Sequence, residues 1–229
     1  MKRMLLAFTI LAALTAGLLA GCSPETAEGP ADEPPIAGEA AIEVDTPTKD
    51  TPIVIDEENR EVLVYAEVNR KWVTEPTRHG VVCASGSNGD KAVFAAGGDA
   101  LDFNKALFQI GAVAGENVTK DSPAGTTVEG DALEITVKWE DQAYPISDLV
   151  VSTGEFGGKT LEPRFGGNYD FQAETKTGCV FCFDSCAAGI TSNAAVGWQS
   201  FANGQVEFRG NGDLLPADGT PVTIVFALR

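Results

Sequence analysis

Histidine is the scarcest reactive residue in this chain, since His79 is the only one among 229 residues. A serine–histidine–carboxylate hydrolase would have to be centred on it, and no Gly-x-Ser-x-Gly sequence marks a nucleophilic serine. The glycine-containing segment 86–91 lacks the spacing of a phosphate-binding loop and predicts a turn. The carboxylates offer no pair that spacing alone would assign as acid and base. We therefore expect no catalytic residue set.

Basic residues are also few. Lysine and arginine number 16 against 33 aspartates and glutamates, which gives a formal net charge of −17. A surface this acidic repels the phosphate backbone of nucleic acids and the headgroups of anionic lipids. We therefore expect no nucleic-acid partner.

The apolar run at the start of the chain is too short to span a membrane as a mature helix. Lys2 and Arg3 precede an apolar segment, residues 4–16, which is the layout of a signal peptide. The following Leu19-Ala20-Gly21-Cys22 resembles the lipobox of bacterial lipoproteins, which implies cleavage after residue 21 and lipidation of Cys22. An ordinary signal peptide or a membrane anchor is the alternative.

Lipidation of Cys22 would place the protein in the cell envelope, held to the membrane on the extracytoplasmic side by its lipid. Ser23, where an aspartate would retain the protein at the inner membrane, favours the outer membrane in a Gram-negative host. In another host the expected location is the outer face of the cytoplasmic membrane.

An acidic, proline-rich linker is expected over residues 22–58. After Cys22 it holds six of the twelve prolines, eleven acidic residues and one lysine, with no aromatic residue. Such a segment cannot bury enough apolar surface to offset its conformational entropy, so it is expected to be disordered. It would hold the folded domain, residues 59–229, away from the membrane.

Beyond the linker, short apolar runs are separated by turn residues, which is typical of β-strands. Residues 133–140 alternate between apolar and polar positions and predict a half-buried strand. Residues 221–228 are almost all apolar and begin at a proline, which predicts a central strand. Asn203-Gly204 predicts a hairpin, and residues 87–90 predict another. The expected strands are 62–68, 81–83, 91–95, 133–140, 147–152, 196–201, 205–209 and 221–228.

One amphipathic helix is expected between Asp99 and Gly111. Asp99 suits the N-cap, and Gly111 suits the position just after the last turn. Phe103, Leu107 and Ile110 repeat at helical spacing on one face. The sequence therefore predicts an α+β fold, with a single mainly-β domain, one clear amphipathic helix and a disordered acidic tether in front.

Three of the five cysteines lie in one short stretch. Cys179-x2-Cys182-x3-Cys186 resembles the latter part of the run that binds iron–sulfur clusters in bacterial ferredoxins, with the first cysteine of that run missing. Cys83 is the only further cysteine once Cys22 is lipidated. We therefore expect one four-cysteine site that adds Cys83 to the run and holds an iron–sulfur cluster or a thiolate-bound metal.

Export leaves other states open for these four thiols. Iron–sulfur clusters are normally built in the cytoplasm, and Lys2-Arg3 does not resemble the twin-arginine signal of proteins that are exported folded. A chain exported unfolded would arrive without a cluster. Outside the cytoplasm the cysteines can form two disulfides, one joining Cys83 to the run, and then hold no cofactor. A short Cys-x2-Cys disulfide is redox-labile, so thiol exchange through an exposed Cys179 of lowered pKa is a further alternative.

His79 is a candidate for an additional metal ligand. On a regular strand residues 79 and 83 point to the same side, so His79 would approach the sulfur of Cys83. The competing interpretation is a hydrogen-bonded structural histidine at a strand end.

Four segments together resemble the YdjY-type bacterial lipoproteins. They are 77–81 (TRHGV), 87–93 (SNGDKAV), 106–112 (ALFQIGA) and the cysteine stretch 178–193, and the likeness extends from about residue 54 to residue 228. Members are described as ferredoxin-like because of the cysteine run, without an established reaction. The resemblance implies a single-domain lipoprotein.

These observations predict an exported, membrane-anchored lipoprotein whose domain is a redox or metal-binding module centred on Cys179, Cys182 and Cys186. With a cluster bound, the expected role is ferredoxin-like electron transfer with a membrane-associated redox partner. The alternative is a non-catalytic binding or accessory domain whose cysteines form structural disulfides.

Overall fold

The computed structural model describes residues 45–229, so the predicted signal peptide, Cys22 and the linker up to residue 44 lie outside the described residues. The described part of the chain forms twelve strands, three α-helices and one 3-10 helix. The strands are β1 (Ile53–Asp56), β2 (Glu61–Val68), β3 (His79–Cys83), β4 (Ala92–Ala96), β5 (Leu133–Trp139), β6 (Gln142–Pro145), β7 (Val150–Gly154), β8 (Pro163–Phe165), β9 (Cys179–Cys182), β10 (Thr191–Asn193), β11 (Val206–Gly210) and β12 (Pro221–Leu228). The helices are α1 (Lys71–Thr74), α2 (Ala100–Gln109), α3 (Tyr169–Thr175) and the 3-10 helix η1 (Ile146–Leu149).

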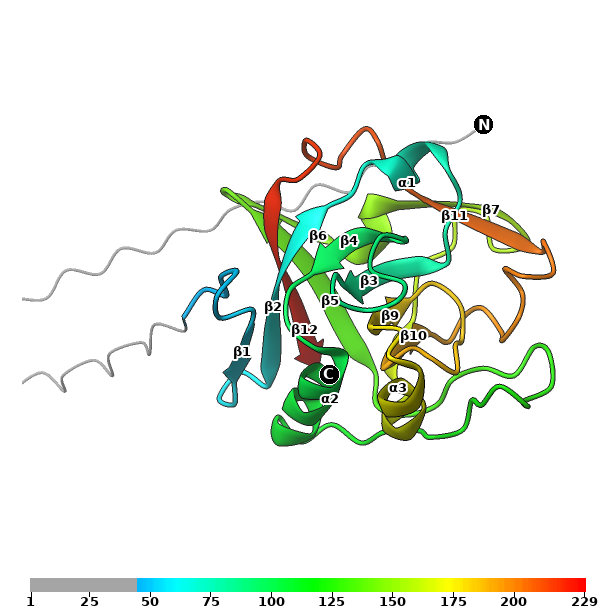
Figure 1. Cartoon of the computed structure of the whole chain (residues 1–229). Coiled ribbons are helices and arrows are strands. Elements are labelled where there is room, and N and C mark those ends of the chain that lie inside the picture. Colours follow the sequence, from blue (N-terminus) through cyan, green and yellow to red (C-terminus); the bar gives the residue numbers. More distant parts are fainter. Residues whose placement is uncertain (1–44) are drawn as a thin grey trace, which may run out of the picture. The chain divides into compact units, whose positions relative to one another are not determined.

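Ten of these strands form one sheet, and β7 and β11 form a separate antiparallel pair. The order in the large sheet is β6-β5-β12-β2-β4-β3-β9-β10-β8, with β1 also paired to β2 (Figure 1). Neighbouring strands are antiparallel except for β3 with β4 and β9 with β10, which are parallel. Strand β9, which carries two cysteines of the run, therefore lies inside the sheet.

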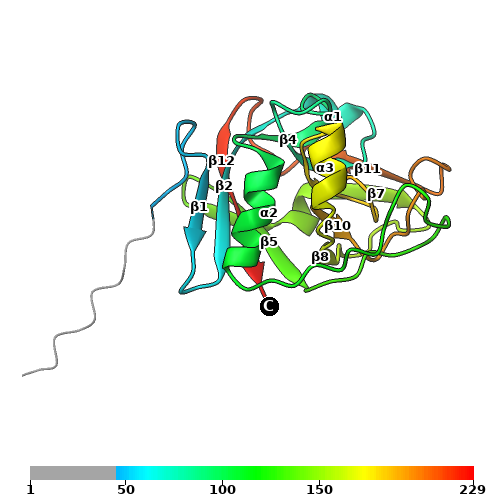
Figure 2. The same cartoon turned by 60° about the horizontal axis from the view of Figure 1, so that its bottom comes forward.

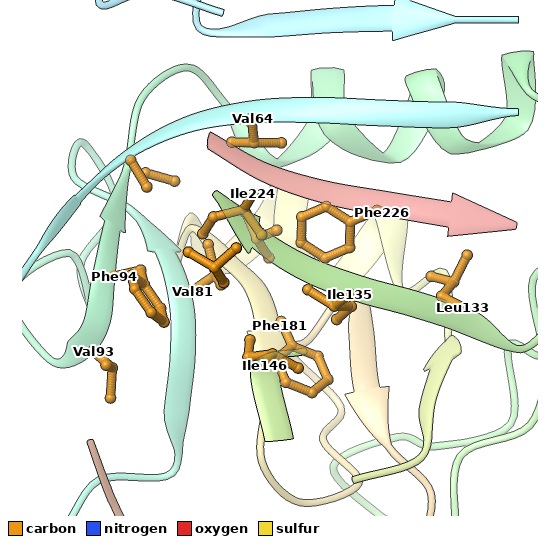
Figure 3. Packing of buried hydrophobic residues seen from close by; sticks show 14 of the residues in the cluster. Val64, Val81, Val93, Phe94, Leu133, Ile135, Ile146, Phe181, Ile224 and Phe226 are labelled. Atoms are coloured by element: carbon orange, nitrogen blue, oxygen red, sulfur yellow. The ribbon is translucent and has the colours of Figure 1, made fainter. Parts of the chain in front are cut away.

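The main core lies against one face of the strands β2, β12 and β5. Alternate residues of β2 and β5 are buried, as the period of two in a half-buried strand requires. Phe226 of β12 is paired with Ile135 of the neighbouring strand β5, and both belong with Ile224 and Phe181 to one buried cluster (Figure 3). Phe181, at the centre of β9, thus ties the cysteine strand to the main core.

Helix α2 packs against the sheet and against α3 (Figure 2). Asp99 caps it by accepting a hydrogen bond from the backbone N–H of Leu101 at 2.7 Å. Gly111, just beyond the helix, has a φ of 86°, a conformation that glycine adopts at little cost. Phe103 and Leu107 face the core. The predicted helix and both of its ends are confirmed.

Most predicted strands are confirmed, and Pro221–Leu228 has the predicted bounds. Three expectations are wrong. Residues 196–201 form turns, so the hairpin predicted at Asn203-Gly204 does not exist, and β11 pairs with β7 instead. Residues 147–149 belong to η1, and only the end of the segment 147–152 is a strand. Residues 87–90 join β3 to β4, but these strands are parallel and form no hairpin.

The expectation of a mainly-β fold is confirmed, and the short helices α1, α3 and η1 are present in addition to the one predicted helix. The folded part begins earlier than residue 59, because β1 pairs with β2 in register from Ile53 to Asp56. A run of three apolar residues, 53–55, supplies the strand inside a segment whose acidic composition predicts a linker. Among residues 45–229, none of the helices has the length and apolar character needed to span a bilayer.

Candidate thiol and histidine metal site

Strand β9 carries two of the three clustered cysteines and lies between β3 and β10 (Figure 1). Cys179 and Cys182 begin and end this strand, and both side chains are fully buried. Cys186 follows in the loop to β10 and is 3% exposed. The run is therefore presented by a strand and a loop in the interior.

Two irregularities in the pairing of β3 with β9 decide which side chains meet. His79 is opposite Cys182, Val81 is opposite Phe181, and Val82 is opposite Cys179, so the register shifts on each side of Val81. A bulge inserts one unpaired residue and turns the following side chain to the other face. Gly80 is the extra residue on β3, and its missing Cβ leaves room for the rings of Phe181 and Phe183.

The bulges bring Cys179, Cys182 and His79 onto one face, although an odd spacing puts residues 179 and 182 on opposite faces of a regular strand. Nδ1 of His79 lies 3.6 Å from Sγ of Cys179. The donor atoms of His79, Cys179 and Cys182 all lie within 4.8 Å of one another. Cys186 is close enough to Cys182 to raise its pKa but lies outside this mutual group.

Cys83 is the predicted site residue that the geometry does not bring into the group. Val82 faces Cys179, so the next residue on β3 faces the opposite side of the sheet. There Sγ of Cys83 lies 3.9 Å from the carbonyl oxygen of Gly97, and the side chain packs in the main core. The expectation that His79 and Cys83 point to one side is wrong, because it assumes a strand without bulges.

The burial of Cys83 in the main core should make the stability of the protein fall at alkaline pH. Burial raises the pKa of this thiol from 9.0 to about 12. The contribution of the buried, neutral thiol to the free energy of unfolding is therefore intact below the pKa of Cys83 in the unfolded chain. It is lost as pH rises toward the pKa of Cys83 in the folded protein. Ionisation in the unfolded state should remove about 2 kcal/mol by about pH 10.5. The deficit of Cys83→Ala relative to wild type should shrink by that amount between about pH 8 and 10.5 in urea unfolding; an unchanged deficit would contradict the assignment.

Two polar residues of the α3 region hold the cysteine loop. Asn168, at the start of α3, donates from Nδ2 to the carbonyl oxygens of Cys186 at 3.1 Å and Gly189 at 2.8 Å. Gln172 donates to the carbonyl oxygens of Cys179 and Ala188 and accepts from the N–H of Gly178. Both side chains are buried. Because buried amides need several partners, this network fixes the backbone on either side of the cysteine run.

A buried ion pair flanks the cysteines. The guanidinium of Arg78 contacts both carboxylate oxygens of Asp184 at 2.8 Å, and the Asp184 side chain is fully buried. The same guanidinium lies 5.3 Å from the ring centre of Trp198. Burial raises the pKa of Asp184 to about 6 against the opposing effect of Arg78, so the carboxylate is charged at neutral pH. Burial lowers the pKa of Arg78, but the negative charge at Cys186 and Asp184 outweighs it and raises the value.

The three thiols of the run differ in acidity. Hydrogen bonds to Cys179 and Cys186, together with burial, raise the pKa of Cys182 well above its usual range. The bond from Cys182 lowers the pKa of Cys179 against burial, with further help from His79 and Asn88. The pKa of Cys186 is lowered by its bond with Cys182, then by Arg78. The surroundings therefore make Cys179 and Cys186 more acidic than Cys182.

Two buried polar atoms near the cluster have no hydrogen-bond partner. They are Oγ of Ser192 and Nε1 of Trp198. Ser192 is opposite Cys182 on the neighbouring parallel strand. A Cβ added at Gly189 would lie 2.6 Å from Oγ of Ser192 and 3.2 Å from Sγ of Cys182, so glycine is needed where the loop approaches both atoms.

Sequence reasoning missed the polar residues around the sulfurs. The sequence gives a weak indication of Arg78 and Asp184 as site residues. Arg78 is a charged residue directly before His79, and Asp184 is a charged residue inside the cysteine stretch. It gives none for Asn88, Asn168 and Gln172, since their segments read as turn or unassigned chain. Only the tertiary fold brings them to the cysteines.

The donor set suits a soft or borderline metal ion. Thiolate and imidazole are preferred ligands of zinc, copper and iron. Two donors that bind one zinc ion at about 2.0–2.3 Å each lie up to about 4.6 Å apart. The donor atoms here lie within 4.8 Å of one another, with His79 and Cys179 at 3.6 Å. His79, Cys179 and Cys182 therefore have both the chemistry and the spacing to bind one ion, and the Cys186 loop lies next to them.

The chain matches the YdjY domain family over residues 53–227. It is similar to the uncharacterized protein YdjY of Escherichia coli (strain K12), with 38% identity over 192 residues that cover 82% of this chain and 84% of that protein. No solved structure matches the chain. With its cysteine strand and loop inside the matched region, the chain belongs to the YdjY domain family.

Proposed function

We propose that this YdjY domain is a metal-binding module of the bacterial envelope, with one thiolate-bound metal ion as its cofactor. Cys179, Cys182, Cys186 and His79 would hold the ion. The observation that carries the proposal is the convergence of three donor atoms within 4.8 Å in the interior of the sheet.

A single ion suits this site better than an iron–sulfur cluster. In a cluster the cysteines bind different irons, so their sulfurs lie farther apart than around one ion. The donor atoms of Cys179 and Cys182 lie within 4.8 Å of each other, and Cys186 is close enough to Cys182 to raise its pKa. A four-cysteine cluster would also need Cys83, whose side chain packs on the opposite side of the sheet.

The surrounding charges support a thiolate site. Three thiolates around a divalent ion leave an excess negative charge, and the guanidinium of Arg78 lies near Cys182 and Cys186. Nδ2 of Asn88 points at Sγ of Cys179 from 3.6 Å. Hydrogen bonds and charges of this kind orient the ligands of a metal site. Zinc would stabilise the loop, whereas iron or copper would also support one-electron transfer to a membrane-associated redox partner.

The envelope location rests on the start of the sequence. A positive n-region, an apolar segment and the Leu19-Ala20-Gly21-Cys22 sequence support export and a lipid anchor on Cys22. Metabolic labelling with a radioactive fatty acid tests this part of the proposal. Label is expected on the wild-type chain and not on Cys22→Ser, and label on both would exclude a lipid on this cysteine.

The metal itself is tested on the full mature chain, purified without oxygen. Metal analysis should give one ion per chain, and after unfolding with a chelator all four cysteines from Cys83 to Cys186 should react as thiols. A metal-free protein that has lost two thiols would instead support an accessory domain with a structural disulfide. Several irons with inorganic sulfide would indicate a cluster.

A further inference from the structure

We propose that Ser192 is a positioning residue that donates a hydrogen bond from its hydroxyl to the metal-bound sulfur of Cys182. This inference rests on the proposed metal site and adds a residue that binds no metal itself. It explains a buried polar group that has no partner elsewhere in the described part of the chain.

The placement of Ser192 follows from the pairing of β10 with β9. Residue 192 is directly opposite Cys182 in this parallel pair, so the two side chains share a face. Both side chains are fully buried. The Cα of Gly189 carries no side chain, and the Cβ position there is close to both Oγ of Ser192 and Sγ of Cys182. The hydroxyl and the sulfur therefore lie around the same small space.

Cys179 already has a hydrogen-bond donor, and Cys186 lies near a positive charge. Asn88 donates an amide N–H toward Cys179. The Arg78 guanidinium lies near Cys186. Cys182 binds metal as a thiolate, and it lies opposite Ser192 on the neighbouring strand. The resulting thiolate can accept the Ser192 O–H, which satisfies the hydroxyl and orients the ligand.

Thr191, next to Ser192 on β10, provides a matched control. It is equally buried, but its Oγ1 donates to the carbonyl oxygen of Val180 at 2.7 Å. It is opposite Phe181 and so belongs to the other face of the strand. Thr191→Val removes a satisfied hydroxyl, whereas Ser192→Ala removes an unsatisfied one.

The experiment compares both variants with the wild type in the full chain, with Co²⁺ as the probe and Zn²⁺ in competition. Ser192→Ala should lower metal affinity about tenfold and move the sulfur-to-cobalt charge-transfer band to lower energy. In the metal-free protein the same change should leave the urea midpoint equal to or above that of the wild type, because an unpaired buried hydroxyl is removed. Thr191→Val should do the opposite, with a lower midpoint and unchanged affinity and band.

Several outcomes would overturn the inference. Unchanged affinity and an unmoved band in Ser192→Ala, with the wild type binding cobalt, would refute the role of Ser192 and leave the metal site standing. A lower metal-free midpoint in Ser192→Ala would show a structural role instead. A wild type that binds neither ion would remove the metal site together with the role of Ser192.

Discussion

Cys182→Ser is expected to lower the affinity for Zn²⁺ by more than about 100-fold, beyond the loss typical of a residue that only supports a ligand. Cys182 lies within 4.8 Å of the donor atoms of Cys179 and His79, and Cys186 is close enough to raise its pKa, so Cys182 is the centre of the donor set. A hydroxyl in its place is a harder and weaker ligand for zinc or copper than a thiolate. The measurement is a Co²⁺ titration followed by Zn²⁺ competition.

Cys83→Ser is the matched control for this prediction. It removes a thiol of equal burial from the opposite side of the sheet, and its affinity for Zn²⁺ should remain close to that of the wild type. Equal losses in both variants would restore the four-cysteine site that the sequence predicts. If neither variant loses affinity for Zn²⁺, the metal does not bind at the cysteine run.

The second large effect is expected at the buried ion pair. Arg78→Met should lower the free energy of unfolding by about 3–5 kcal/mol, because it leaves a buried carboxylate without its partner. Asp184 is fully buried and makes two 2.8 Å contacts with the guanidinium. Urea unfolding of the metal-free protein measures this loss without any contribution from bound metal.

The double variant Arg78→Met with Asp184→Leu is the control. It removes both charges, so much of the lost stability should return. The pH dependence gives a second check. The pKa of Asp184 is already about 6 and should rise further without Arg78. The variant should therefore keep its stability below the pKa that Asp184 has in the unfolded chain, and lose it as pH rises through the pKa that Asp184 has in the folded variant. The deficit of Arg78→Met should be larger at about pH 8 than at about pH 5; the reverse order would contradict the role of the pair.

The sequence predicts those parts of the fold that depend on local pattern. The alternation in residues 133–139 and the apolar run 221–228 each describe a strand whose burial follows from its own residues. The helix between Asp99 and Gly111 is equally local, since its cap and its apolar face lie within one segment. The clustering of the three cysteines is visible for the same reason.

The composition of the site depends on pairing that no local pattern records. The regular-strand assumption places His79 with Cys83, whereas the bulges at Gly80 and Val180 place His79 with Cys179 and Cys182. A bulge changes the face of the sheet on which a side chain lies, but the pattern of residue types along the strand does not reveal it. Arg78 and Asp184 are likewise separated by 106 positions and meet only in the fold.

X-ray absorption at the edge of the bound metal, on the full chain purified without oxygen, tests the central claim most directly. The proposed site predicts three sulfur neighbours and one nitrogen neighbour around a single ion, with no second metal nearby. Four sulfurs with a neighbouring iron would instead show a cluster that recruits Cys83. A protein whose metal has only oxygen neighbours would contradict a thiolate site altogether.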